Sequence, residues 1–381
     1  MLGRLGGAVR NTERNKRAIV GLSGGVDSSV AAALLCEYNY DVRAVFMRNW
    51  DTRDESSLSS LGGVKGCEWE ADYEAARGVC QHLGIPSPQL IDLSREYWQQ
   101  VFQPSLDVWE QGNTPNPDIA CNRYIKFDAL AKLVLKSSDD VLATGHYAQI
   151  RNGALHRAAD RTKDQSYYLA GVCRDMLHNV MFPLGTLHKT HVRSLAHELS
   201  LPTAARSESM GICFIGERGN FGNWLNDYIH TTHGDFKTVD GATIAKHNGV
   251  HHYTIGQKAR IGGMAKKWYV AGKQGSDVII VDSPTHDLLK CKSIITKNDI
   301  NWLVDKEQYV HAPFQATAQV RHRQQEVRCT VHVVNDTLNV TYLTHEMAVA
   351  PGQTCAIYID DMCVASATIE SVVSVSGERV S

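Results

Sequence analysis

The chain has 381 residues, a formal net charge of −2 and a pI near 6.8. This length predicts two or three domains, because single hydrophobic cores seldom grow beyond about 250–300 residues. No stretch approaches the roughly 18 uninterrupted apolar residues that span a bilayer, which argues against an integral membrane protein. The near-neutral charge neither indicates nor excludes a nucleic acid partner, so any surface that binds one must be local.

The N-terminal segment 1–16 is basic, with arginines at 4, 10 and 14 against the single acid Glu13. Its charge fits a short mitochondrial presequence, although the segment is poor in serine. A frayed basic tail before the first strand is the alternative. The ten cysteines include no Cys-x-x-Cys pair and favour reduced thiols over a disulfide framework.

A strand, a glycine-rich turn and a helix are predicted next. Residues 17–22 (RAIVGL) form an apolar run typical of a buried strand, and 28–38 (SSVAAALLCEY) carry alanine and leucine at helical spacing. Further strands are predicted at 42–47, 90–93 and 141–144, with helices at 68–83, 94–111 and 122–136. This alternation predicts an α/β fold with a doubly wound parallel sheet.

The composition and hydrophobic pattern of the sequence change after residue 215. A helical piece near FGNWLNDYI is followed by a loop-rich, basic, glycine-containing stretch. From about residue 290, β-branched runs such as VRCTVHVV, LNVTYL and TCAIYI recur between turn signals and predict a small β-barrel. We therefore expect an α/β domain at 17–215, a small central domain at 216–288 and a β-barrel domain at 289–381.

The segment GLSGGVDSS at 21–29 has the composition of a phosphate-binding loop. It falls where the first strand ends and the first helix begins, the position at which parallel sheets bind phosphate. Gly24 and Gly25 permit a tight turn with inward-facing amides, and Ser23 and Ser28 add hydroxyl donors. No lysine follows the glycines, so this is not the loop that grips β- and γ-phosphates for phosphoryl transfer. A glycine turn without a ligand is the alternative.

SGGVDSS instead resembles the loop of the ATP pyrophosphatases, which implies ATP as the cofactor. In that superfamily the loop holds pyrophosphate as it leaves, and an acceptor oxygen takes AMP. The carboxylate of Asp27 would repel phosphates, so we expect it to help hold Mg²⁺.

One cysteine follows a proline-broken loop. Cys121 ends the run GNTPNPDIAC, and we expect it just before a helix that begins near Asn122. The field at that helix start would lower the thiol pKa and favour the reactive thiolate. Asp118, three residues earlier, is placed to transfer a proton or to orient a base, and a turn-forming aspartate is the alternative.

Seven ordered motifs make the chain resemble the tRNA-specific 2-thiouridylases, which modify the wobble uridine. They are SGGVDSS, TPNPDIACN, ATGHYA, KDQSYYL, GICFIG, HYTIGQ and APGQ, and they extend through nearly the whole chain. The resemblance implies an N-terminal ATP pyrophosphatase domain, a central tRNA-contacting domain and a C-terminal β-barrel. Within the central domain, the basic and aromatic side chains of 246–269 would clamp phosphates and stack bases, or else form a solvated loop.

The resemblance also assigns roles to two cysteines. Taken alone, Cys213 in the apolar stretch SMGICFIG is more typical of a core residue than of a catalyst. In the family, the cysteine that matches Cys213 carries a persulfide. The one that matches Cys121 acts as nucleophile or resolving thiol and forms a disulfide with it during turnover. Only the fold can bring two residues so far apart in the chain together.

Carried over by motif, the resemblance implies the remaining site residues. The ATP site would comprise Gly21, Leu22, Ser23, Gly24, Gly25, Val26, Asp27, Ser28, Ser29, Met47 and Gly145. The tRNA contacts would comprise Asn116, Pro117, Asp118, His146, Lys163, Asp164, Gln165, Arg321, His322 and Gln353. The chain departs from the common pattern at His322, where tyrosine is frequent, and after HYTIGQ, which continues as KARIGG. These departures concern the RNA contacts rather than the chemistry.

The implied reaction is ATP-dependent replacement of the uridine O2 by sulfur. The oxygen attacks the α-phosphate, pyrophosphate leaves, and a persulfide supplied by a relay from a cysteine desulfurase delivers sulfur as AMP departs. Two alternatives remain open from the residues. An adenylating ligase of the same superfamily that acts on a small metabolite would need neither cysteine, and a nucleotide-binding regulatory protein would never turn ATP over.

Two segments bear on location. VFMRNWD at 45–51 and SESMGICFIG at 207–216 look closer to the eukaryotic mitochondrial branch of the family than to the bacterial one. Together with the basic N-terminus, they favour a mitochondrial location over a bacterial-type cytoplasmic one.

Overall fold

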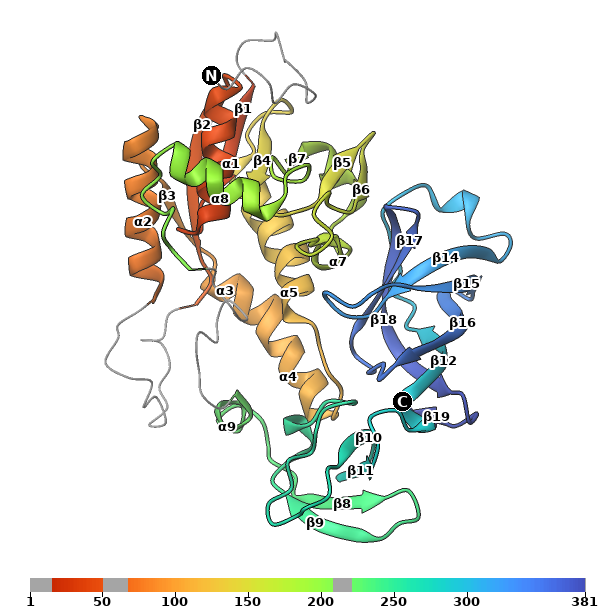
Figure 1. Ribbon diagram of the computed structural model, residues 1–381. Helices are drawn as coiled ribbons and strands as arrows, with labels where there is room; N and C mark the ends of the chain where they lie inside the picture. The colour runs from red at the N-terminus through yellow and green to blue at the C-terminus, as the bar shows by residue number, and fades with distance from the viewer. Residues whose placement is uncertain (1–15, 51–67, 208–220, 381) are drawn as a thin grey trace.

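The computed structural model describes residues 16–50, 68–207 and 221–380. The α/β domain and the β-barrel lie side by side, and the central domain lies at one end of both (Figure 1). Within the described ranges, no helix is long and apolar enough to cross a membrane.

The first sheet is parallel, with strand order β3-β2-β1-β4-β7. Its strands are β1 (Arg17–Gly21), β2 (Asp41–Arg48), β3 (Gln89–Asp92), β4 (Val141–Thr144) and β7 (Val180–Met181). Strand side chains alternate between faces, so Ala18 and Ala143 pack on one helical layer while Ile19 and Leu142 pack on the other. The predicted doubly wound parallel sheet is confirmed.

Helices cover both faces of this sheet. One layer consists of α1 (Val26–Glu37), α2 (Glu68–Leu83) and α8 (Lys189–Glu198). The other consists of two long helical segments. One runs through α3 (Ser94–Tyr97), η2 (Trp98–Phe102) and α4 (Gln103–Glu110), and the second through α5 (Pro117–Ala120), η3 (Cys121–Leu130) and α6 (Ala131–Val134). Parts of both segments, η2 and η3, are π-helical.

The central domain is a four-stranded sheet of order β10-β11-β8-β9. Its strands are β8 (Gly234–Thr238), β9 (Thr243–His247), β10 (Tyr269–Gln274) and β11 (Asp277–Val281), with η5 (Val250–His252) beside them. Phe236, Val270 and Ile280 form its small core. The preceding helix α9 (Phe221–Leu225) packs instead into the large core of the α/β domain, through Trp224 and Leu225.

The C-terminal sheet closes into a barrel because β12 pairs with both β16 and β18. Its strands are β12 (Lys290–Thr296), β13 (Asn301–Trp302), β14 (Phe314–Gln319), β15 (Val327–Val334), β16 (Thr337–Met347), β17 (Thr354–Ile359), β18 (Met362–Ser374) and β19 (Arg379–Val380). Short helical turns complete the fold: α7 (Ser166–Leu169), η4 (Arg174–Asn179), η6 (Asp287–Leu289) and η7 (Lys306–Gln308). The predicted C-terminal β-barrel is confirmed.

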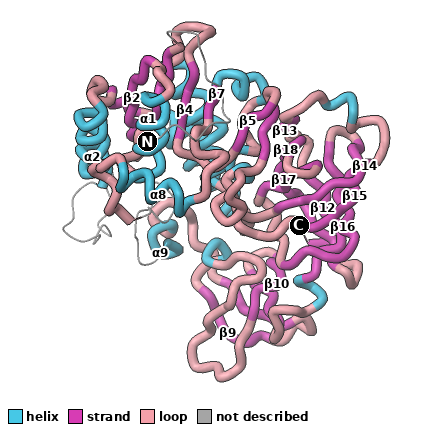
Figure 2. The backbone as a smooth tube through the Cα atoms, turned by 45° about the horizontal axis from the view of Figure 1, so that its top comes forward, coloured by secondary structure: helices cyan, strands magenta, loops and turns pink. Residues whose placement is uncertain are grey.

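A hairpin from the α/β domain extends the barrel sheet. Strands β5 (Gln149–Arg151) and β6 (Ala154–His156) pair with each other, and His156 pairs with Met362 of β18. In Figure 2, β5 lies beside the barrel strands β13 and β18. The hydrogen-bonded sheet therefore includes residues of the α/β domain as well as those of the barrel. The two domains are joined by backbone as well as by side chains.

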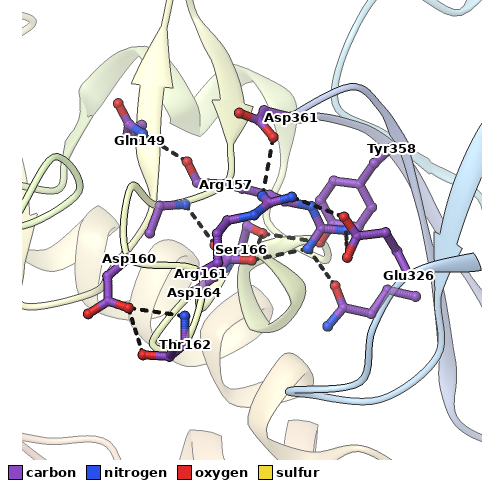
Figure 3. Close-up of polar contacts among 12 residues, drawn as sticks. Gln149, Arg157, Asp160, Arg161, Thr162, Asp164, Ser166, Glu326, Tyr358 and Asp361 are labelled. Atoms are coloured by element: carbon purple, nitrogen blue, oxygen red, sulfur yellow. Dashed lines mark hydrogen bonds and ion pairs between the residues drawn. The ribbon is translucent and has the colours of Figure 1, made fainter. Parts of the chain in front are cut away.

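A buried charge network fixes the same junction (Figure 3). Arg157 is 3% exposed; its Nη1 lies 3.2 Å from Oδ2 of Asp164 and donates to Oε1 of Gln319 at 2.7 Å. Its guanidinium also lies over the ring of Tyr358, 3.6 Å from the centroid. Asp164 accepts a further bond from the Ser166 hydroxyl at 2.8 Å. Burial makes each charge depend on the other, because neither is hydrated.

Loss of the Asp164 carboxylate should destabilise the protein strongly. In Asp164→Ala the Arg157 guanidinium would lose its close, buried counter-ion and keep only the partly exposed Glu326 carboxylate, 3.7 Å away. We therefore expect a loss of about 3–5 kcal/mol in the free energy of unfolding, measured by urea denaturation. Arg161→Ala is the control, because Arg161 is 45% exposed and pairs with Glu326 and Asp361 at the surface. It should cost about 0–1 kcal/mol. Equal losses in the two variants would contradict the account.

Candidate nucleotide and thiol site

The predicted phosphate loop connects β1 to α1 at the carboxyl edge of the parallel sheet. Gly21 at the end of β1 lies beside Thr144 at the end of β4. Gly24 has a φ of +74°, and a Cβ there would lie 2.5 Å from the carbonyl oxygen of Asp72. Gly25 is the N-cap of α1 and supplies no capping side chain. The first-turn amides of α1 are therefore available to phosphate oxygens.

The loop serines stabilise the loop itself. The Ser23 amide donates to Oγ of Ser28 at 3.2 Å, and the hydroxyls of Ser28 and Ser29 donate to the Gly25 carbonyl at 3.2 and 2.8 Å. Ser28 and Ser29 are buried. The expectation that Ser28 offers its hydroxyl to phosphate is not supported, because that hydroxyl is already engaged.

Asp27 forms an ion pair that its sequence context did not reveal. Its two carboxylate oxygens accept from Nζ of Lys189 at 2.7 and 2.8 Å, and one also accepts from the Tyr147 hydroxyl at 2.8 Å. Lys189 begins α8, far from the loop in the chain. We expected Asp27 to bind Mg²⁺ because its carboxylate would otherwise repel phosphates. The ion pair with Lys189 already compensates that charge, so this reason does not hold. In the described part of the chain no three His, Cys, Asp or Glu side chains gather as a metal-binding group.

Arg206 is a second cation that sequence reasoning missed. It donates to the Gly24 carbonyl and to Oδ1 of Asp72, both at 2.6 Å, and so ties the loop to α2. No local signal marks Arg206 or Lys189, because both reach the loop through the tertiary fold.

Three apolar residues of the predicted ATP site have different settings. Leu22 and Val26 are buried in the core, so their backbones alone can face a ligand. Met47 is half-buried near the carboxyl end of β2, in register with Ile91 of β3.

Gly145 follows β4 and lies against the phosphate loop. A Cβ at this position would lie 2.7 Å from the Ser28 amide nitrogen and 2.8 Å from the Asp27 carbonyl carbon. Both neighbours are backbone atoms that cannot rotate away. The residue at 145 therefore has to be glycine for the loop to keep this shape.

The helix that carries the candidate thiol begins earlier than expected. Asn116 caps it by accepting from the Ile119 amide at 3.3 Å, and Pro117 is its first residue. Cys121 thus lies in the second turn, not before the helix. The expected lowering of its pKa by the helix start has little basis, because that effect fades within the first turn. An Asn-Pro pair is a start signal that the sequence contained.

Cys121 is 6% exposed, and the side-chain amide of Asn49 lies 3.8 Å from its sulfur. Asn49 directly follows β2 and was not singled out from the sequence. Its amide N–H points at the sulfur, and such a donor stabilises a thiolate.

Polar side chains extend from Asp118 along the helix to β4. Asn122 donates to the Asp118 carbonyl at 3.0 Å, and Lys126 donates to Oδ1 of Asn122 at 3.0 Å. Lys126 also lies 3.4 Å from Nε2 of His146, whose Nδ1 lies 2.7 Å from the Thr144 hydroxyl. Burial raises the pKa of the Asp118 carboxyl, and the charge of Lys126 partly opposes this. The pKa of His146 is lowered well below its usual value by burial and by Lys126.

The barrel contributes aromatic and basic groups beside Asp118. His322 stacks on Tyr168, with ring centroids 4.3 Å apart and planes 28° apart. Burial, with the negative charge of Asp118, raises the pKa of the Tyr168 phenol to about 12. Arg321 donates to the Met347 carbonyl at 3.2 Å. The structure thus brings His322 to the Asp118 cluster across the domain boundary.

Several residues predicted to contact tRNA are engaged within the protein. Gln353 donates to the carbonyls of Thr114 and Pro115 at 3.0 and 2.9 Å. Gln165 accepts from the Tyr147 amide at 2.9 Å, and Asp164 is buried in the network with Arg157. These positions argue for structural roles, and their contacts with RNA stay predictions.

The second candidate cysteine, Cys213, lies outside the described residues. Its predicted approach to Cys121 therefore stays a prediction. In the basic stretch of the central domain, Lys266 pairs with Asp282 at 2.9 Å and lies over the Trp268 ring. That lysine is engaged at the protein surface.

Three family models match the chain in order. They are the tRNA methyl transferase HUP domain at residues 16–217, the tRNA methyl transferase PRC-barrel domain at 222–282 and the aminomethyltransferase β-barrel domain at 292–369. The fold and these matches define a HUP-domain protein that carries a PRC-barrel domain and a C-terminal β-barrel.

Similar curated proteins specify the family. The tRNA-specific 2-thiouridylase MnmA of Bacillus velezensis is 40% identical over 368 residues, which cover 93% of this chain and 95% of the relative. MnmA of Staphylococcus carnosus is 38% identical, covering 96% of this chain and 98% of the relative. The chain belongs to the tRNA-specific 2-thiouridylase family.

Solved structures are similar over part of the chain. The U34-tRNA thiolase NcsA from Methanococcus maripaludis is 19% identical, with a TM-score of 0.34, over 56% of this chain and 65% of that one. NMN synthetase from Francisella tularensis is 16% identical, with a TM-score of 0.32, over 51% of this chain and 66% of that one.

Gly145→Ala should impair ATP binding. The added methyl group would push the Asp27–Ser28 backbone out of place, so we expect the Kd for ATP, measured by calorimetry, to rise at least about tenfold, or about 1.4 kcal/mol. Gly78→Ala in α2 is the matched control, since a Cβ there meets nothing within 4 Å. Unchanged ATP affinity in Gly145→Ala would show that the loop does not bind phosphate in this shape.

Proposed function

We propose that this chain is an ATP-dependent tRNA sulfurtransferase that adenylates O2 of the wobble uridine and replaces it with sulfur, giving 2-thiouridine, AMP and pyrophosphate. Membership of the 2-thiouridylase family supports the reaction and its tRNA substrate. One structural observation carries the proposal. Gly145 packs against the phosphate loop, and the next residue, His146, contacts the helix of Cys121 through Lys126. Nucleotide and thiol therefore meet at one edge of the sheet.

The first step is assigned to the phosphate loop. Uridine O2 forms a bond to the α-phosphorus of ATP, and the bond from that phosphorus to the β-phosphate oxygen breaks. Amides of the first turn of α1 hold the departing pyrophosphate. Mg²⁺ bound with ATP would neutralise phosphate charge, and Asp27 could contribute a ligand only if it gave up its ion pair with Lys189.

The second step is assigned to two cysteines. A persulfide on Cys213, filled by a relay from a cysteine desulfurase, provides the sulfur. In one route its terminal sulfur attacks C2, the C2–O bond breaks and AMP leaves. Cys121 then attacks the Cys213 sulfur of the adduct, the S–S bond to the base breaks, 2-thiouridine leaves, and a disulfide between Cys121 and Cys213 remains. In the other route Cys121 first cleaves the persulfide and frees hydrosulfide, which attacks C2. In both routes a thiol reductant restores the cysteines.

Asp118 is suited to move a proton in this site. Burial raises its pKa, so it is more readily protonated near neutral pH than an ordinary aspartate. It lies one helical turn before Cys121, beside Tyr168 and Lys126. We assign it acceptance of the proton that uridine N3 loses when O2 is adenylated, a role that a raised pKa favours.

We also propose a mitochondrial location, with a bacterial-type cytoplasmic one as the alternative. The basic charge of residues 1–16 and the segments VFMRNWD and SESMGICFIG support it. The relatives described above are bacterial. Import of the full chain into isolated mitochondria, compared with a chain that lacks residues 1–16, is the test.

The activity is tested with full-length protein, tRNA, ATP, Mg²⁺, a cysteine desulfurase with cysteine as the source of persulfide sulfur, and a thiol reductant. We expect tRNA-dependent pyrophosphate release and 2-thiouridine in the digested tRNA, detected by nucleoside mass spectrometry. Cys121→Ser should abolish multiple-turnover thiolation but keep ATP binding. Cys173→Ser, which changes an exposed thiol, should behave as wild type.

Three results would contradict the proposal. Repeated thiolation by Cys121→Ser would remove that residue from both routes. Pyrophosphate release without tRNA would favour an adenylating ligase that acts on a small metabolite. No pyrophosphate release under any condition would favour a regulatory nucleotide-binding protein.

A further inference from the structure

Lys126 is a cation in the site to which the proposed reaction assigns no role. It is half-buried, and its Nζ donates to Oδ1 of Asn122 at 3.0 Å and contacts Nε2 of His146 at 3.4 Å. Both partners are uncharged acceptors. Among the residues that the structure describes, no carboxylate comes within 4.0 Å of this ammonium. The Asp118 carboxyl interacts with it electrostatically from farther away, so Lys126 forms no direct ion pair there.

The hydrogen bonds around Lys126 have a fixed direction. An ammonium has donors and no acceptor, so Nε2 of His146 must accept, and the ring proton must sit on Nδ1. That proton is donated to the Thr144 hydroxyl, 2.7 Å away. Burial and Lys126 lower the pKa of His146, which keeps the ring neutral. Two neutral groups, Asn122 and His146, therefore position the Lys126 ammonium, and its positive charge can still interact with a ligand.

The π-helix sets the direction in which Lys126 points. Cys121 and Lys126 are five residues apart within η3. In a regular α-helix such residues are rotated by about 140° from each other. Hydrogen bonds from i to i+5 widen the turn and bring the two residues onto nearly the same side. The ammonium is thus directed along the face that carries Cys121 and Asn122.

Lys126 connects this face of the helix to the phosphate loop through His146. His146, which Lys126 contacts, follows Gly145, and Gly145 lies against the backbone of Asp27 and Ser28. The ammonium therefore stands between the phosphate loop and the thiol helix. If the proposed function holds, the linkage between the uridine C2 and the α-phosphate must occupy this space, because it joins the two groups that these elements bind.

We propose, on the basis of the proposed function, that Lys126 is a catalytic residue of the sulfur-transfer step, where its ammonium binds the bridging oxygen of the adenylated uridine. In that step sulfur supplies the electron pair of the new C2–S bond, and the pair of the broken C2–O bond passes to the oxygen of departing AMP. Negative charge grows on the bridging oxygen then, whereas it declines when O2 attacks ATP. A fixed cation therefore favours the second step over the first.

Single-turnover experiments separate the two steps. Full-length enzyme with tRNA and α-³²P-labelled ATP, without a sulfur source, reports formation of the tRNA adenylate. Hydrosulfide is then added, and release of labelled AMP and formation of 2-thiouridine are followed. We expect Lys126→Met to form the adenylate at nearly the wild-type rate and to release AMP about 100-fold more slowly. Lys126→Arg should recover part of this rate.

Lys132→Met is the matched control. Lys132 lies on the same helical segment, is 74% exposed and pairs with Asp128, so both steps should proceed as in the wild type. AMP release by Lys126→Met at the wild-type rate would overturn the inference. Equal slowing of both steps would also overturn it, because that result indicates a structural role. A wild-type enzyme that forms no tRNA adenylate would instead refute the proposed function.

Discussion

The site depends on the contact between Gln353 of the barrel and residues 114–116, which lead into the helix of Asp118 and Cys121. Gln353 donates to the backbone carbonyls of Thr114 and Pro115 and accepts from the side-chain amide of Asn116 at 3.4 Å. The Thr114 amide donates to the Pro351 carbonyl at 3.0 Å. One side-chain amide thus satisfies the backbone of the segment that leads into the helix of Asp118 and Cys121.

The barrel packs closely against the backbone of Thr114, and this approach requires a glycine in the barrel. Gly352 has a φ of +89°, and a Cβ there would lie 2.9 to 3.1 Å from Thr114 backbone atoms. The Tyr167 hydroxyl donates to the carbonyls of Val320 and Thr354, each at 3.0 Å, and reinforces the junction from the other side. On the central domain, Lys273 donates to the Gly112 carbonyl. All three domains therefore contribute to the geometry of the segment 112–121, which carries Asp118 and Cys121.

Local sequence patterns predicted most helices and strands, but they did not predict the contacts between residues that are far apart in the chain. The apolar runs located β1 and β4, and helical spacing located α2, because these segments are set by their own burial. The β5–β6 hairpin was missed although its turn is Asn152-Gly153, both with positive φ, a recognised hairpin signal. Lys126 and Asn49 were missed for a different reason. Nothing near them in the chain indicates a ligand, and their role arises from the elements that they face.

Hydrogen–deuterium exchange of residues 114–121 in Gln353→Leu, without tRNA, tests most directly whether the barrel holds the segment that carries Asp118 and Cys121. The account predicts faster amide exchange in this segment than in the wild type, no change in the phosphate loop, and a slower thiolation rate. Unchanged protection of 114–121 would contradict it and would leave Gln353 to act through RNA alone.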